Sequence, residues 1–154
     1  MVSRRLVDRM DYLVDTNVLL RALAFANPLR PVARQAIRTL LRNGAALCVA
    51  PQNLVELWNV CTRPEKYNGL GKSVAATDRY LRFIESFLAV LPQTPDLFTK
   101  WRELVVTHEV SGTKVYDARL VAAMSLHHVD RILTFNTDDF ARFKSIEAIN
   151  PTGI

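Results

Sequence analysis

The sequence predicts an α/β fold, a three-layer α/β/α domain with a mostly parallel central sheet. Short apolar runs of strand length alternate along the chain with longer segments of helical periodicity. The runs at 45–50 and 131–135 are largely apolar, which is typical of strands covered on both faces. Alternating strands and helices of this kind build a parallel sheet between two helical layers. The 154 residues suffice for one domain with a sizeable core.

The first half of the chain predicts two strands, each followed by helix. Residues 11–15 are expected to form a short buried strand, and residues 17–25 a helix. Residues 31–42 carry apolar side chains at helical spacing and end at an Asn-Gly pair, a common helix stop. The apolar run 45–50 is the second strand, and the proline directly after it starts a helix over 51–62.

A loop with two glycines, residues 64–73, leads into the second half of the chain. Ser73 is a suitable N-cap for the next helix, because its hydroxyl can accept a backbone N–H. The remaining elements continue the alternation: helix 73–89, strand 89–92, helix 95–109, helix 115–128, strand 131–135, a short helix 137–143 and strand 146–149.

The composition favours a cytoplasmic protein with an anionic partner. Lys and Arg total 20 against 15 for Asp and Glu, a net charge of +5. Nucleic acid is the obvious polyanion, and a merely basic surface is the alternative. Cys48 and Cys61 form no CxxC pair and are expected to be reduced core residues, as in cytoplasmic proteins. No apolar run is long enough for a membrane span, so we expect no membrane association.

The sequence predicts that the first ten residues lie outside the domain. Residues 1–10 are expected to be a dispensable N-terminal extension, and Met10 offers an alternative start codon. Three arginines and an acid precede any apolar stretch, which is unlike a secretory signal. Residues 11–154 are expected to form a single domain.

Three acids interrupt otherwise apolar patterns. Asp15 comes directly after a predicted strand, Glu56 lies early in the helix after the second strand, and Asp117 lies in the first turn of a late helix. The polar run Asn-Thr-Asp-Asp at 136–139 directly follows another strand. Because carboxyl ends of parallel strands and the starts of the following helices share one edge of the sheet, we expect these groups to meet there.

Bringing carboxylates together requires a proton or a cation. Two carboxylates about 4 Å apart repel by about 4 kcal/mol at an effective dielectric of 20. Their oxygens are hard ligands that suit Mg²⁺ or Mn²⁺, and Mg²⁺ takes one or two carboxylates while keeping several waters. Such an ion activates water and neutralises charge that builds on phosphoryl oxygens. An acidic pocket in a basic protein therefore suits cleavage of a phosphodiester bond.

Each acid also has a simpler interpretation. Asp15 could cap the helix that follows it. Glu56 could pair with Arg63 or Lys66 on the surface, and Asp117 could interact with its helix dipole. The sequence contains no P-loop, no GxGxxG and no GxSxG, so the common nucleotide-binding and serine-hydrolase motifs are missing.

Four segments of the chain resemble a known family in their order and spacing: LVDTNVLL, NLVELWNV, VYDARLVAAM and ILTFNTDDFARF. They resemble the PIN-domain family of metal-dependent ribonucleases, and most closely the VapC-type toxins of prokaryotic toxin–antitoxin pairs. The resemblance covers residues 11–151. It implies a PIN-like fold, a Mg²⁺- or Mn²⁺-dependent endoribonuclease that hydrolyses RNA, a cognate antitoxin as protein partner, and a homodimer.

The resemblance also implies roles for individual residues. Asp15, Glu56 and Asp117 would be catalytic and hold the metal ion. Many members carry a fourth acid after the late strand, and here Asn136 takes that catalytic position. Asp139 is expected to compensate as a further metal ligand.

Substrate contacts are expected from polar residues around the acids. Asn17 matches the family's polar residue two positions after the first acid, where it would orient that carboxylate or a metal-bound water, and Thr134 would assist from the late strand. Thr16 beside the first acid, and Arg63 at the loop after the helix of Glu56, complete this predicted set.

Two other functions remain open at this point. A PIN-like domain that has lost its chemistry could bind only RNA or protein, and the neutral side chain of Asn136 leaves room for this. A metal-dependent phosphotransferase could use Asp15 as its nucleophile. That chemistry usually has a second acid two residues later, and Asn17 at that position counts against it.

Overall fold

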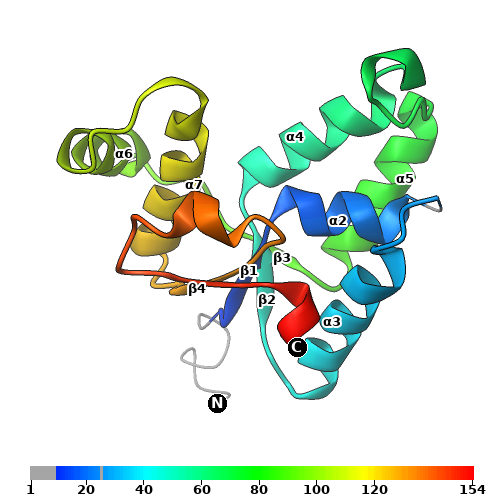
Figure 1. The fold of residues 1–154 in the computed structure, drawn as a ribbon, viewed down its shortest axis with the longest axis horizontal. Coiled ribbons are helices and arrows are strands. Elements are labelled where there is room, and N and C mark those ends of the chain that lie inside the picture. The colour runs from blue at the N-terminus through cyan, green and yellow to red at the C-terminus, as the bar shows by residue number, and fades with distance from the viewer. Residues whose placement is uncertain (1–9, 25) are drawn as a thin grey trace.

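The computed structural model describes residues 10–24 and 26–154 and confirms the predicted α/β fold class (Figure 1). Five strands form one sheet in the order β3-β2-β1-β4-β5, and every neighbouring pair is parallel. The strands are β1 (Tyr12–Val14), β2 (Leu47–Val49), β3 (Ala89–Val90), β4 (Arg131–Leu133) and β5 (Glu147–Ile149). Each lies inside the range expected from the sequence.

Six α-helices connect these strands: α2 (Thr16–Leu23), α3 (Arg30–Arg42), α4 (Pro51–Thr62), α5 (Val74–Glu85), α6 (Leu97–Thr107) and α7 (Val115–Leu126). Short 3-10 turns are η1 (Glu65–Tyr67), η2 (Gly112–Lys114), η3 (Thr137–Phe140) and η4 (Pro151–Gly153). The expected N-cap of α5 is confirmed, since the Ser73 hydroxyl accepts the Ala76 N–H at 3.1 Å. Only the last residue expected of the first helix, 25, lies outside the described part of the chain.

Several predicted helices are shorter than expected: α2, α6 and α7 each end two residues early and α6 also begins two residues late, while the largest differences are in α5 and the last predicted helix. Helix α5 ends at Glu85 instead of residue 89, because the chain turns at Ser86 and continues into β3. The apolar residues at 87–91 fit a helix and a buried strand equally well by pattern. The short helix expected at 137–143 is only the 3-10 turn η3.

Helices cover both faces of the sheet (Figure 1), and the buried apolar side chains form two clusters. Side chains alternate along the strands: Val14 and Leu133 pack toward α2–α5, whereas Leu13 and Ile132 pack toward α7 and the apolar side of α6. Both groups are fully buried. The three layers of the predicted architecture are therefore helices α2–α5, the sheet, and helices α6–α7.

The strand order places a switch point between β1 and β4. The chain runs from β1 to β2 and β3 on one side, and then returns to add β4 and β5 on the other. Ligands of open parallel sheets bind beyond the carboxyl ends of the strands at such a point. Here the Asp15 N–H, just after β1, donates to the Leu133 carbonyl at the end of β4 at 3.0 Å.

Other expectations concern the cysteines, the membrane and the first residues. Cys48 and Cys61 are buried free thiols, and burial raises the pKa of Cys48 to about 12. Among the described helices, none combines the length and hydrophobicity that crossing a membrane requires. Residues 1–9 of the expected N-terminal extension lie outside the described residues, so that extension and the single-domain boundary stay predictions.

Candidate active site

Asp15 stands at the switch point with both carboxylate oxygens engaged. It is the N-cap of α2, and its Oδ1 accepts the Thr16 N–H at 2.8 Å. Its Oδ2 accepts the Thr134 hydroxyl at 2.8 Å. Only 9% of the residue is exposed. The helix-capping interpretation is therefore confirmed, but it uses one oxygen, while the other faces the end of β4.

A small hydrogen-bond network ties the ends of β1 and β4 together. The Asn17 amide donates to Asp15 Oδ2 at 3.3 Å and to Thr134 Oγ1 at 3.1 Å. Its own oxygen accepts the Phe135 N–H at 3.1 Å. The Asn136 N–H donates to Thr134 Oγ1 at 3.1 Å. Asn17 and Thr134 thus fix the rotamer of the Asp15 carboxylate, which is the orienting role the resemblance implied for Asn17.

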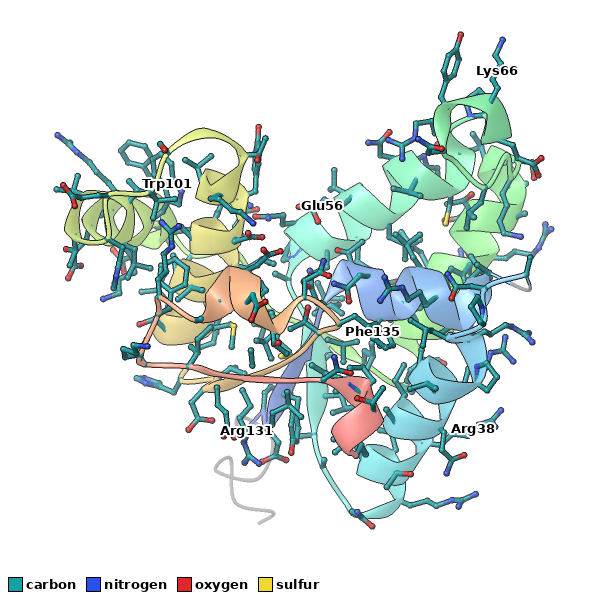
Figure 2. All side chains as sticks on the ribbon, in the orientation of Figure 1. Arg38, Glu56, Lys66, Trp101, Arg131 and Phe135 are labelled. Carbon is teal, nitrogen blue, oxygen red and sulfur yellow. The ribbon has the colours of Figure 1, made fainter. Side chains whose placement is uncertain are left out.

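Glu56 is joined to the same edge through Thr16. Figure 2 shows Glu56 on the side of α4 that faces α7. Its Oε2 accepts the Thr16 hydroxyl at 3.1 Å. Buried Asn53 donates to Thr16 Oγ1 at 3.2 Å and accepts the Ala50 N–H at 2.9 Å. These hydrogen bonds connect the start of α4 to the start of α2. Thr16, which the sequence predicted as a substrate-contact residue, makes this connection from the first turn of α2.

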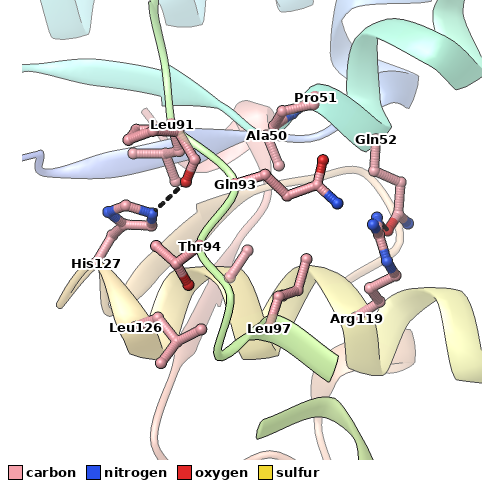
Figure 3. A pocket seen from close by; sticks show the side chains of 12 residues that line it. Ala50, Pro51, Gln52, Leu91, Gln93, Thr94, Leu97, Arg119, Leu126 and His127 are labelled. Carbon is pink, nitrogen blue, oxygen red and sulfur yellow. Dashed lines mark hydrogen bonds between the residues drawn. The ribbon is translucent and has the colours of Figure 1, made fainter. Parts of the chain in front are cut away.

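Gln52 is a site residue that sequence reasoning missed. Its Nε2 donates to Glu56 Oε1 and to the Tyr116 carbonyl, both at 2.9 Å, and its Oε1 accepts from Arg119 Nη1 at 3.0 Å. Figure 3 shows Gln52 and Arg119 facing each other at the rim of the adjoining pocket. The signal in the sequence was a polar Gln-Asn pair in the first turn of the helix that follows a buried strand.

Asp117 lies in the first turn of α7, as expected, and it has a cation beside it. Lys114 Nζ is 3.9 Å from Asp117 Oδ2 and forms an ion pair of 2.5 Å with Asp139 Oδ1. The hydrogen bond to Asp139 raises the pKa of Lys114, so its ammonium is charged at neutral pH. The structure therefore adds Lys114 to the set of residues at this edge, and it gives predicted metal ligand Asp139 a lysine partner.

The acids share one electrostatic environment. Burial raises the pKa of Asp15 to about 6 against its hydrogen bonds from Thr134 and Thr16, and the charges of Glu56 and Asp117 raise it further. Burial also raises the pKa of Asp117 to about 6, with the charges of Asp139 and Glu56 adding to the rise and Lys114 opposing it. Asp15 and Asp117 thus both lie within electrostatic range of Glu56, and Asp117 also lies within range of Asp139. That these acids form one site stays a prediction.

Two predicted residues stand apart from this cluster. Arg63 is the C-cap of α4, about 10 Å along the helix axis from Glu56 at 1.5 Å per residue. Its guanidinium donates to the Asn68 carbonyl at 3.1 Å, and its backbone lies where any Cβ at Gly69 would stand. Arg63 therefore stabilises the loop that follows α4. The side chain of Asn136 is at the right edge but exposed, and its backbone makes the contact with Thr134.

The donor set fits Mg²⁺ or Mn²⁺ by its chemistry. Within residues 10–24 and 26–154, no three His, Cys, Asp or Glu side chains stand close enough to hold a metal ion as they are placed. Mg²⁺ needs only one or two carboxylates directly and completes its shell with water. Asp15, Glu56 and Asp117 are the candidates for that smaller demand, because the charges of Glu56 and Asp117 both reach Asp15.

An α/β fold with acids near the switch point is typical of metal-dependent phosphodiester-cleaving domains. Comparison with known families shows to which family the chain belongs. Over residues 12–146 the sequence matches the PIN domain, and the chain belongs to the PIN-domain family. The family inferred from the four sequence motifs is thereby confirmed. No curated protein sequence matches the chain significantly.

Solved structures share this fold at low sequence identity. VapBC2 from Rickettsia felis, bound to a DNA fragment from their promoter, matches with a TM-score of 0.70 and 16% identity, covering 92% of this chain and 98% of that one. VapBC-1 from nontypeable Haemophilus influenzae matches with a TM-score of 0.68, 17% identity and 93% and 99% coverage. VapC20 from Mycobacterium tuberculosis, a Sarcin-Ricin loop cleaving toxin, matches with a TM-score of 0.64, 16% identity and 86% and 95% coverage.

Proposed function

We propose that this protein is a metal-dependent endoribonuclease that hydrolyses RNA phosphodiester bonds and serves as the toxin of a VapBC-type pair. The observation that carries the proposal is the electrostatic contact among acids at the switch point: the charges of Glu56 and Asp117 raise the pKa of Asp15, and the charge of Glu56 raises that of Asp117. An arrangement that costs folding free energy is typical of a functional site. The similarity in fold to VapC20, a toxin that cleaves the Sarcin-Ricin loop, supports RNA as the substrate.

The residues of the site have different roles in the proposed reaction. Asp15 is held at the floor of the site by Thr134 and Asn17, so its carboxylate does not rotate. Glu56 is oriented by Thr16 and Gln52. Asp117 provides a further carboxylate from the first turn of α7. A bound Mg²⁺ or Mn²⁺ would neutralise the charge that develops on the phosphoryl oxygens.

A protein partner and an oligomer belong to the same proposal. The Rickettsia felis and Klebsiella pneumoniae structures are toxin–antitoxin proteins with this fold, which supports a cognate antitoxin for this chain. A homodimer and a cytoplasmic location remain predictions from the sequence. The net charge of +5 suits the RNA substrate.

RNA cleavage with and without added ions tests the proposal. We expect the wild-type chain to cleave RNA only when Mg²⁺ or Mn²⁺ is added, and Asp15→Asn and Asp117→Asn to abolish cleavage while the circular dichroism spectrum stays that of a folded protein. RNA binding without cleavage, unaffected by either substitution, would establish the binding-module alternative instead. Phosphate trapped covalently on Asp15 would establish the phosphotransferase.

A further inference from the structure

We propose that this site works with one divalent ion, and that the ammonium of Lys114 supplies the second positive charge. The inference rests on the proposed nuclease function and states how many ions that function uses. It assigns a role to a lysine that no sequence motif singled out.

The position of Lys114 is the main observation. Its Nζ is 2.5 Å from Asp139 Oδ1 and 3.9 Å from Asp117 Oδ2, so one ammonium reaches carboxylates from α7 and from η3. Asp117 and Asp139 are the carboxylates that would be available to hold a second divalent ion. The ammonium of Lys114 already contacts both of them and supplies a positive charge there.

Electrostatics give the reason why a cation belongs there. The charge of Asp139 destabilises the ionised form of Asp117, and the charge of Lys114 opposes that effect. A fixed ammonium neutralises part of this repulsion without the loss of hydration that Mg²⁺ binding demands. Asp139 then acts as the partner of Lys114, and it is no longer free to compensate for the neutral Asn136.

The local backbone places the ammonium reproducibly. Lys114 ends the η2 turn and is the N-cap of α7, three residues before Asp117. Gly112 opens that turn with a φ of +62°, a conformation that favours glycine. The Lys114 side chain is 45% exposed, so donors not used by Asp139 can reach a phosphate of the substrate. An ammonium acts on a phosphate as a point charge, which is one role of a second metal ion.

Counting bound ions tests the inference directly. Mn²⁺ titrated into the metal-free chain and followed by electron paramagnetic resonance gives the number of ions per chain. We expect one Mn²⁺ for the wild type and for Lys114→Arg, which keeps the charge. We expect two for Lys114→Met, because Asp117 and Asp139 then face each other without a cation. Lys100→Met is the matched control: it removes the same charge from α6, where Lys100 pairs with Glu103, and it should bind one ion.

Cleavage assays complete the test. Lys114→Met loaded with one equivalent of Mn²⁺ should lose at least about tenfold in kcat/KM, and a second equivalent or Lys114→Arg should restore most of it. Two Mn²⁺ per wild-type chain, or one ion and unchanged cleavage in Lys114→Met, would overturn the inference while leaving a nuclease. Absence of cleavage by the wild type with any ion would instead overturn the proposed function, and the ion count would still be decided.

Discussion

Asp15 shows how one side chain serves both the fold and the site. Its two oxygens take hydrogen bonds from Thr16, Asn17 and Thr134, which favour the ionised form. Burial and the neighbouring charges outweigh these bonds and raise its pKa to about 6. At neutral pH the ionised carboxylate of Asp15 therefore lowers the free energy of unfolding.

The first prediction follows from the sign of that shift. The folded-state pKa of Asp15 lies above its ordinary value of 3.8, so the folded chain binds more protons than the unfolded chain between these pH values. Its contribution to stability is then lost as pH rises from about 4 to about 6, and the full cost remains above pH 6. Asp15→Asn removes the cost. We expect its free energy of unfolding, relative to wild type, to gain about 2–3 kcal/mol between pH 4 and pH 7 in urea titrations.

The control for this measurement is an acid on the surface. Asp78 is on α5, where it pairs with Arg82 in an exposed (i, i+4) ion pair. Asp78→Asn should leave the pH dependence of stability within a few tenths of a kcal/mol of wild type. If Asp15→Asn and wild type kept a constant difference across this pH range, the raised pKa would be contradicted.

The elements were predictable to the extent that local pattern decides them. Helical spacing gave α3 to within one residue, and the acids at strand ends and helix starts were predicted at a common edge because parallel topology alone brings them there. The end of α5 was not predictable, because its apolar continuation fits two structures. The roles of Lys114 and Arg63 depend on where long side chains turn, and sequence spacing carries no information on that.

Gln52 couples two elements of the site, and its loss should separate them. It joins Glu56 on α4 to the Tyr116 carbonyl on α7 and accepts from Arg119. Gln52→Met keeps the side-chain length and removes all three bonds. We expect cleavage to fall about 10- to 100-fold, as when groups that orient a site's ligands are removed, and stability to fall by about 1–2 kcal/mol.

A glutamine that bonds to a neighbour on its own helix is the matched control. Gln35 is on α3 and is exposed, and within the described part of the chain it donates to Thr39 one turn away. Gln35→Met should leave cleavage and the urea midpoint close to wild type. Cleavage by Gln52→Met that matched Gln35→Met would show that Glu56 needs no such support, and the role of Gln52 would then be confined to packing between α4 and α7.

The whole molecule combines a basic net charge with an acidic site. The +5 charge attracts a polyanion, while the acids at the sheet edge repel its phosphates wherever no cation balances them. In the proposed nuclease the basic residues therefore attract the RNA, whereas the acids at the sheet edge carry out the cleavage. Substitutions in the acids should remove cleavage without removing RNA binding.

This separation leads to a prediction at the scale of the molecule. Binding of single-stranded RNA to the Asp15→Asn chain, measured by fluorescence anisotropy in EDTA, should weaken steeply with salt because it releases counterions from the RNA. For about three neutralised phosphates, the affinity should fall roughly 20-fold between 50 and 200 mM KCl. A salt-independent affinity would mean that the basic surface does not carry the RNA. In that case the positive charge would be ordinary surface composition, and recognition would have to come from the site itself.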